Sequence, residues 1–225
     1  MPDHVGAWAL RDIAWRLTGD RRHDWLHGPP ELVAPVELEL DEARLAAIVA
    51  FLDGLHDRSP TPVGQSVRDG TQTRGGLFDR HEPEVRWIEE SFRHAVDTYR
   101  AALPPEDPAH PLLRHRNAEW RFAGSWSIRV FSGGRHTEHI HAQGLVSSAA
   151  YFAVPAGETD GDPKAGWLEL GRSPPDLRLD LPALLSVEPR PGRCALFPST
   201  LYHGTRPFSA GKRIAVATDV HLSSR

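Results

Sequence analysis

The stretch WRFAGSWSIRVFSGGRHTEHIH, residues 120–141, decides the fold expected for this chain. In its first half the apolar side chains stand on even-numbered positions, namely Trp120, Phe122, Trp126, Ile128 and Val130. A period of two is that of a β-strand with one buried face. The pair Gly133-Gly134 then predicts a turn, because glycines together interrupt regular structure. The sequence therefore predicts a strand, a turn and a histidine-rich segment in that order.

Short apolar runs continue this pattern to the end of the chain. Clusters of glycine and proline separate further candidate strands at residues 145–154, 166–170, 184–187, 194–197 and 214–220. Many short strands with turn signals between them are typical of a β-sandwich or a small barrel. We therefore expect a mainly β fold from about residue 116 onward.

The first part of the chain has a helical period instead. Asp41 precedes an apolar stripe that ends near Gly54, and Pro83 opens a second stripe that ends at Pro104. Between them, Gln65–Phe78 is rich in Gly, Thr and Arg and indicates an ordered loop or a short strand. Each helix has one apolar stripe to bury, so we expect the helices to cover one face of the β-structure. This predicts one domain over residues 1–225, with a helical support region at 1–115 and a β core at 116–225.

The composition excludes several classes of protein. The chain has 225 residues, of which 40% are apolar and 25% charged, as in globular domains. A net charge of −4 gives no electrostatic reason to expect a nucleic acid partner, and one cysteine cannot build a disulfide framework. No apolar run reaches the length of a membrane span, and the start MPDHVGAWAL lacks the pattern of a signal peptide. We expect a cytoplasmic protein without a membrane partner.

The most informative feature of the composition is a cluster among 13 histidines. On a strand, residues i and i+2 point to the same side, so His139 and His141 can converge on one ion, and so can His136 and Glu138. His203, which precedes a glycine after a candidate strand, can supply a third ligand. Imidazole suits zinc, copper, iron and nickel, so the histidines alone do not choose the metal.

Arg213 stands ten residues after His203, at the head of a candidate strand. An arginine beside a metal site can hold a carboxylate through a bidentate pair. This spacing favours a metal site that also binds an acid.

In this order, His139-x-His141, His203 and Arg213 resemble the ligand and co-substrate pattern of the Fe(II)- and 2-oxoglutarate-dependent oxygenases. The segments HTEHIHAQGLVSSAAYFAVP, ALFPSTLYHGTRPF and KRIAVATD resemble a bacterial subgroup with an H-x-H signature, and QSVRDGTQTRGGLF extends the likeness upstream. The resemblance implies a double-stranded β-helix, also called a jelly roll, which is a cupin-like fold. It also implies Fe(II), 2-oxoglutarate and O₂ as cofactor and co-substrates.

Alignment with prolyl hydroxylases of this superfamily implies His139, His141 and His203 as the metal ligands. It places His136 at an aromatic position that lines the substrate site and turns Glu138 away. This departs from the usual triad of two histidines and one carboxylate. The alternative, in which His136 and Glu138 are ligands, would restore a carboxylate to the triad.

The same resemblance implies which residues bind 2-oxoglutarate. Arg213 would pair with the carboxylate farthest from the metal, and Tyr151 falls where related hydroxylases place a tyrosine that bonds the same group. Arg129, on the preceding strand, is expected to reach the pocket. Ala215 replaces a serine that is usual two positions after the arginine.

The activity that the resemblance implies is oxidation, and commonly hydroxylation, of a small molecule or a peptide side chain. Two alternatives stay open from the sequence alone. One is a cupin-type dioxygenase with three histidines that does not use 2-oxoglutarate. The other is a jelly-roll module that binds a metal or ligand without catalysis. The sequence identifies neither the substrate nor the oligomeric state, nor does it settle the role of the loop Gln65–Phe78.

Overall fold

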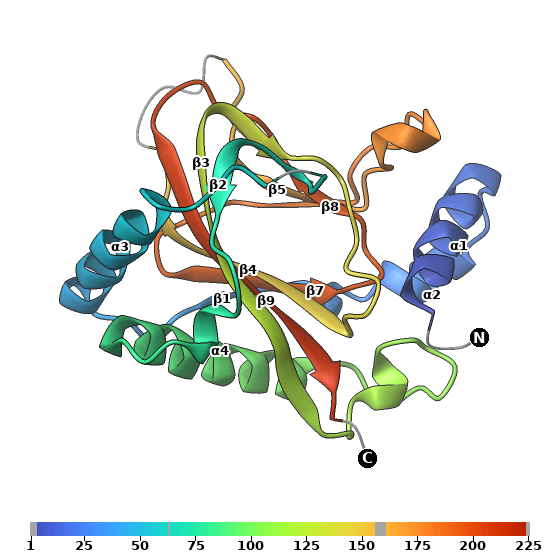
Figure 1. The fold of residues 1–225 in the computed structure, drawn as a ribbon. Helices are drawn as coiled ribbons and strands as arrows, with labels where there is room; N and C mark the ends of the chain where they lie inside the picture. The colour runs from blue at the N-terminus through green and yellow to red at the C-terminus, as the bar shows by residue number, and fades with distance from the viewer. Residues whose placement is uncertain (1–3, 63, 156–160, 224–225) are drawn as a thin grey trace.

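The computed structural model describes residues 4–62, 64–155 and 161–223 and is mainly β (Figure 1). Its helices are α1 (Val5–Thr18), α2 (Arg22–His27), α3 (Glu42–His56) and α4 (Pro83–Ala102). Its strands are β1 (Ala34–Glu37), β2 (Val67–Gln72), β3 (Trp120–His136), β4 (Val146–Ala153), β5 (Leu168–Leu170), β6 (Leu185–Val187), β7 (Arg193–Pro198), β8 (His203–Thr205) and β9 (Lys212–Leu222).

The strands form two antiparallel sheets, a large one in the order β1-β7-β4-β9-β3-β2 and a small one in the order β6-β5-β8. Figure 1 shows β5 and β8 of the small sheet lying over β4 and β9 of the large sheet, so the two sheets face each other. At one end they are joined by an isolated bridge between His139 and His203. This arrangement confirms the jelly roll that the resemblance implied.

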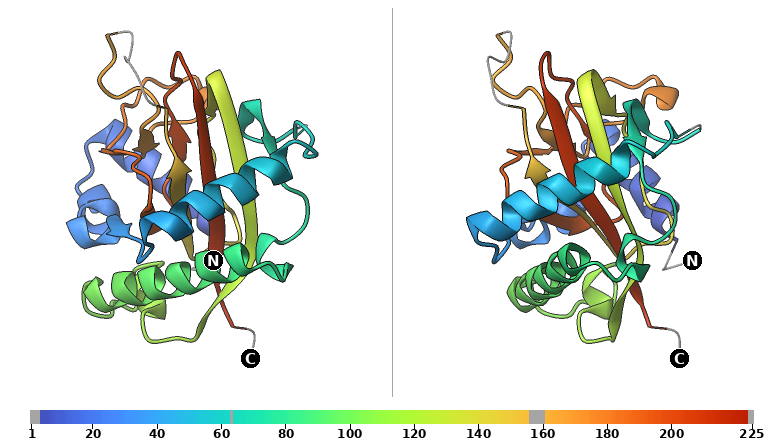
Figure 2. Two further views of the ribbon diagram at one scale, coloured as in Figure 1. Left: turned by 90° about the vertical axis from the view of Figure 1, so that its left-hand side faces the viewer. Right: turned by 60° about the vertical axis from the view of Figure 1, so that its left-hand side comes forward.

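Helices α3 and α4 lie across the outer face of the large sheet (Figure 2). Their buried side chains meet apolar residues that point outward from β4, β7 and β9 in one continuous core, which includes Ile48, Leu52, Ile88, Phe92, Tyr99, Val146, Phe152, Leu196, Ile214 and Val216. Burial of such side chains stabilises the fold by about 1.5–3 kcal/mol each. The helices thus support the sheet from the side that faces away from the small sheet, as expected. The domain boundaries stay a prediction.

Both of these helices begin where the sequence indicates. The Asp41 side chain accepts a hydrogen bond from the backbone N–H of Arg44 at 2.7 Å, which caps the free end of α3. Pro83 is the first residue of α4, where its missing N–H costs nothing. The segment between them forms the short strand β2, one of the two alternatives predicted.

The prediction that the apolar residues of β3 share one buried face is wrong. A register shift between Phe122 and Ser125 reverses the alternation, so Phe122 packs with the helices while Trp126 and Ile128 face the small sheet. The predicted turn at Gly133-Gly134 is also wrong. The strand continues through it to His136, with Gly133 at φ 80°, and the ladder with β2 is interrupted opposite this point. An irregularity of this kind bends a strand without ending it.

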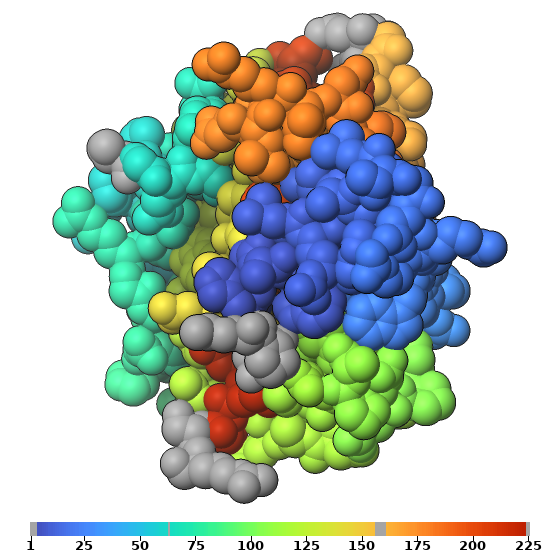
Figure 3. Space-filling view, turned by 90° about the vertical axis from the view of Figure 1, so that its right-hand side faces the viewer, coloured from blue at the N-terminus to red at the C-terminus, as the bar shows by residue number. Residues whose placement is uncertain are grey.

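Helices α1 and α2 and strand β1 lack a clear signal in the sequence. β1 contains Pro35 and lies at the edge of the large sheet, where a missing N–H is tolerated. α1 and α2 lie beside the segment around residues 171–182 and beside the chain after α4 (Figure 3). Polar contacts attach them: Arg16 donates to the carbonyl of Gly171 and, at 2.6 Å, to that of Pro182.

In the part of the chain that the structure describes, no helix has both the length and the apolar character needed to cross a bilayer.

Candidate metal centre and pocket

Three imidazoles converge where the chain crosses between the two sheets. His139 and His141 lie in the segment that follows β3, and His203 is the first residue of β8. One ring nitrogen from each histidine lies within 4.8 Å of the others. Two backbone hydrogen bonds of 3.0 Å between His139 and His203 fix the distance between these chain segments. The arrangement can hold one metal ion with three nitrogen ligands.

Each of these histidines has its other ring nitrogen against an acceptor. The Nδ1 of His139 is 2.8 Å from the carbonyl of Thr137, and that of His203 is 3.1 Å from the carbonyl of Leu201. The Nδ1 of His141 is 2.5 Å from a carboxylate oxygen of Asp219. Because these acceptors favour the tautomer with its proton on Nδ1, the Nε2 of the neutral ring has the lone pair that a metal ligand needs.

Burial keeps two of the three clustered histidines neutral. Desolvation lowers the pKa of His139 to about 4 and that of His203 well below its usual value, and the neighbouring histidines lower both further. Both rings are therefore uncharged near neutral pH. A metal can bind there without displacing protons from Nε2.

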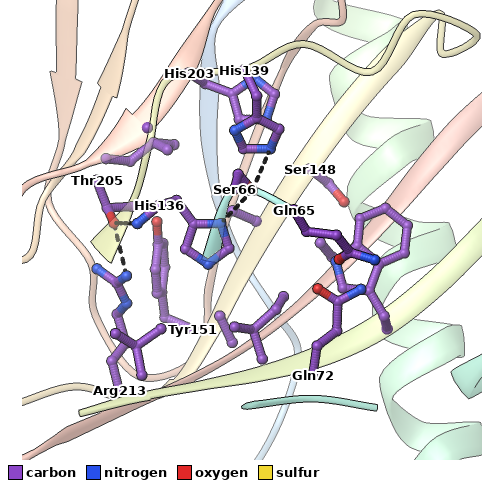
Figure 4. A pocket seen from close by; sticks show the side chains of 18 of the residues that line it. Gln65, Ser66, Gln72, His136, His139, Ser148, Tyr151, His203, Thr205 and Arg213 are labelled. Atoms are coloured by element: carbon purple, nitrogen blue, oxygen red, sulfur yellow. Dashed lines mark hydrogen bonds between the residues drawn. The ribbon is translucent and has the colours of Figure 1, made fainter. Parts of the chain in front are cut away.

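The histidines open onto a pocket of about 400 Å³ between the two sheets. Its walls are largely apolar, with Trp126, Ile128 and Val130 from β3 and Leu168 from β5. The described residues that line it include one arginine, Arg213, and no lysine, aspartate or glutamate. Arg213 lies at the opposite end of the pocket from Gln65 and Gln72 (Figure 4).

Arg213 is the most unusual group in this pocket. It is only 2% exposed, and its pKa is lowered because burial penalises the charged form. Its Nη1 donates to the carbonyl of Gly166 at 2.7 Å and its Nη2 to the hydroxyl of Thr205 at 2.9 Å. Among the residues that the structure describes, no carboxylate pairs with it. A buried guanidinium with neutral partners alone provides a site for an anion.

Tyr151 lies beside this guanidinium and is also incompletely satisfied. Its hydroxyl is buried and has no hydrogen-bond partner in the described part of the chain. Desolvation raises its pKa to about 12, although the nearby positive charge of Arg213 acts in the opposite direction. The hydroxyl is thus a neutral donor directed into the pocket, close to the position that an anion on Arg213 would occupy (Figure 4).

A fourth histidine, His136, lines the pocket between Arg213 and the three clustered histidines (Figure 4). The hydroxyl of Ser66 lies 3.4 Å from the Nδ1 of His136 and 3.4 Å from the Nε2 of His139. The backbone N–H of His136 donates to the hydroxyl of Thr205. His136 therefore faces the pocket without joining the three clustered nitrogens.

Two other predicted residues lie elsewhere. Arg129 does not reach the pocket, because it alternates with Ile128 and Val130 and so points to the helix side, where it contacts Asp53 at 2.8 Å and Asp57 at 3.0 Å. Glu138 lies outside the cluster, 3.8 Å from Arg172.

Asp219 is one of the residues that sequence reasoning missed. It stands six positions after Arg213 on β9, and Ala215 and Ala217 between them line the pocket. The alternation of that strand places Asp219 on the same face, so the period of two could have found it. Ser66 and Thr205 were missed because serine and threonine carry no comparable signal.

Comparison with known proteins agrees with this geometry. Residues 124–219 match the family model described as "Putative 2OG-Fe(II) oxygenase". No curated protein sequence matches the chain. The matched segment spans the strands and loops that carry all three clustered histidines and Arg213.

Solved structures show the same fold at low sequence identity. A prolyl hydroxylase from Trichoplax adhaerens, in complex with a hypoxia inducible factor peptide, has a TM-score of 0.58 and 14% identity over 94% of this chain and 97% of that one. HygX from Streptomyces hygroscopicus, with nickel, 2-oxoglutarate and hygromycin B bound, has a TM-score of 0.59 and 13% identity, over 85% of this chain and 83% of that one. A Pseudomonas putida prolyl-4-hydroxylase has a TM-score of 0.56 and 14% identity, over 85% of this chain and 92% of that one.

Residues 124–219 therefore carry a 2OG-Fe(II) oxygenase domain, and its reaction class is oxidation with Fe(II), 2-oxoglutarate and O₂.

Proposed function

We propose that His139, His141 and His203 hold Fe(II), and that Arg213 and Tyr151 bind the far carboxylate of 2-oxoglutarate. The observation that carries this proposal is the buried, acid-free guanidinium of Arg213 in the same pocket as the three converging imidazoles. The residues present fit both groups, because unprotonated nitrogens suit the metal and an uncompensated positive charge suits the dianion.

The charge of Arg213 explains why a carboxylate belongs at this end of the pocket. A buried, unpaired ion costs several kcal/mol, and much of this is recovered when an opposite charge binds. The guanidinium already donates to the carbonyl of Gly166 and the hydroxyl of Thr205, which fix its orientation, and its remaining N–H groups are available to the ligand. Tyr151 adds a neutral donor, and its unpartnered hydroxyl would gain an acceptor when the carboxylate binds.

The remaining side chains orient the reactants. When bound, iron and 2-oxoglutarate supply the activated oxygen, and the protein positions them and excludes water. The Nδ1 contacts of the three histidines fix their rings before the metal binds, and the apolar wall from β3 keeps the co-substrate end of the pocket dry. His136 lies alongside the space between Arg213 and the histidines, where it can contact bound ligands.

The primary substrate would occupy the other end of the pocket. Gln65 and Gln72 line the pocket from the segment around β2, Trp126 of β3 also lines it, and none of these side chains is charged. Arg68 donates to backbone carbonyls of its own segment, and Arg74 does not line the pocket. We propose a small-molecule or peptide substrate that presents a neutral group to the site. The proposed reaction is hydroxylation of that group.

The experiment that tests the co-substrate assignment measures 2-oxoglutarate affinity in the presence of Ni(II), which does not turn over. Arg213→Ala should raise the Kd for 2-oxoglutarate about a hundredfold or more, because a charged hydrogen-bonded pair is lost. Metal affinity should change little. The matched control is Arg129→Ala, which removes an arginine that points to the opposite side of the sheet. Equal losses in the two variants, or loss of metal and keto acid together in Arg213→Ala, would contradict the assignment.

A further inference from the structure

We infer that Asp219 is a positioning residue for His141. Its carboxylate would contact this ligand and not the metal itself, and would supply the negative charge that a carboxylate ligand usually brings to such a site. The inference rests on the proposed function, in which His141 is a ligand. It concerns the charge and orientation of that ligand, which the proposed function does not address.

The contacts fix Asp219 from the neighbouring strand β4. It pairs in register with Ser147 of β4, whose hydroxyl lies 3.4 Å from the same oxygen, Oδ1, that contacts His141. The hydroxyl of Ser147 is 2.9 Å from that of Ser199, and both serines are fully buried. The carboxylate is therefore held in place by a polar chain before any ligand binds.

The ring of His141 is held on its other side as well. The indole of Trp126 lies 5.5 Å from the ring of His141 between centroids, at an angle of 52°. The ring thus has an aromatic neighbour on β3 and a carboxylate on β9. Rotation of the imidazole away from the cluster would break both contacts.

His141 differs from the other two proposed ligands in the charge of its partner. His139 and His203 face backbone carbonyls, which are neutral, whereas His141 faces a carboxylate. Three imidazoles alone would leave a bound divalent ion more positive than the usual set with one carboxylate does. A carboxylate on His141 makes this ring a stronger ligand and restores the total charge of that usual set.

The pairing also predicts which substitutions can coexist. His141→Asp alone would recreate the usual triad but would place the new carboxylate next to that of Asp219. Like charges in contact disfavour one another, so this variant should bind metal poorly. Adding Asp219→Asn to it removes the repulsion and supplies an amide donor.

The test uses Co(II), whose visible d–d spectrum reports its ligands, and measures both affinity and spectrum in the full chain. Asp219→Asn keeps the size of the side chain and removes its charge, and Asp219→Ala also removes the acceptor. We expect losses of affinity of about tenfold for the first and up to about a hundredfold for the second, with an altered spectrum for the second. The control is Glu138→Gln, which removes a carboxylate from the same region without touching a clustered histidine. It should match the parent.

The outcomes separate this inference from the proposed function. If the parent binds Co(II) and both Asp219 variants bind it equally well with the same spectrum, Asp219 is only structural and the inference is overturned, while the proposed function stands. If the parent binds no Co(II), both are overturned. In the double variant, tighter binding than in His141→Asp supports the inference, and weaker binding refutes it. Asp219→Asn keeps the test valid should Asp219→Ala fail to fold, as melting of the metal-free proteins will show.

Discussion

At the scale of single residues, the pocket is built from groups that are unsatisfied in the folded chain. Among the described residues, Arg213 has no acid partner and the hydroxyl of Tyr151 has no hydrogen-bond partner. Leaving such groups buried costs stability, which the ligand recovers on binding. Both groups lie at the same end of one pocket, and for this reason they indicate a site for an anion and not a local defect in packing.

Tyr151→Phe should therefore have opposite effects on stability and on binding. Removal of a buried hydroxyl without a partner should leave the free energy of unfolding unchanged or raise it by about 1 kcal/mol. Loss of a donor to a carboxylate should raise the Kd for 2-oxoglutarate about tenfold or more. Denaturant unfolding and titration with 2-oxoglutarate in the presence of Ni(II) check both.

Tyr99→Phe is the matched control for this prediction. The hydroxyl of Tyr99 is fully buried but donates to the carbonyl of Leu32 at 2.9 Å, far from the pocket. This variant should lose about 1 kcal/mol of stability and keep its affinity for 2-oxoglutarate. A Tyr151→Phe protein that is destabilised while binding the keto acid normally would show that Tyr151 is only a core residue.

At the scale of elements, one buried histidine joins helix α3 to the strands that carry the pocket. The Nδ1 of His56 is 2.9 Å from the hydroxyl of Thr71 on β2, and its Nε2 is 2.9 Å from that of Ser127 on β3. Desolvation, together with the nearby charge of Arg129, lowers the pKa of His56 to about 4. This ring is thus held neutral at the end of the helix.

His56 predicts a dependence of stability on pH. Its pKa is about 4 when folded and near 6.5 when unfolded, so between these values the unfolded chain binds the proton and the folded chain does not. Stability should fall as the pH drops from about 6.5 to 4, by on the order of 2–3 kcal/mol from this group.

His56→Gln should reduce the slope of stability between these pH values, as followed by denaturant unfolding at several pH values. The other buried histidines contribute to the slope of the parent as well, so the difference between parent and variant is the quantity that tests the prediction. His81→Gln, at an exposed position, is the control and should leave the slope unchanged. An unchanged slope in His56→Gln would contradict the account of this contact.

The elements that the sequence predicted correctly are those whose signal is local. Asp41 and Pro83 mark helix starts by their own chemistry, and the strand around Ile214 shows an uninterrupted alternation. The strand β3 was only partly predicted, because the bulge after Phe122 and the extension through Gly133 depend on pairing with strands distant in sequence. Strand β1 pairs with β7 across more than 150 residues, and nothing local announces it.

At the scale of the whole molecule, the large sheet has the supporting helices on one face and the pocket on the other. On β9, Ile214 and Val216 pack against the helices while Arg213 and Ala215 line the pocket. The small sheet closes the other side and brings His203 to the histidines that follow β3. The spacing of the motifs could predict this convergence through the resemblance. It could not predict that Arg129 points to the helix side or that Asp219 contacts His141, since both depend on exact register.

The most direct test of the central claim, that three histidines and one arginine form a site for Fe(II) and 2-oxoglutarate, is anaerobic titration of the metal-free protein with Fe(II) and then 2-oxoglutarate. The visible absorption band of the iron–keto acid chelate reports whether both bind together. We expect the band in the parent, its loss in His203→Ala, its retention in Glu138→Gln, and a far higher requirement for 2-oxoglutarate in Arg213→Ala. Iron binding without the band, or a band that persists in His203→Ala and disappears in Glu138→Gln, would contradict the claim.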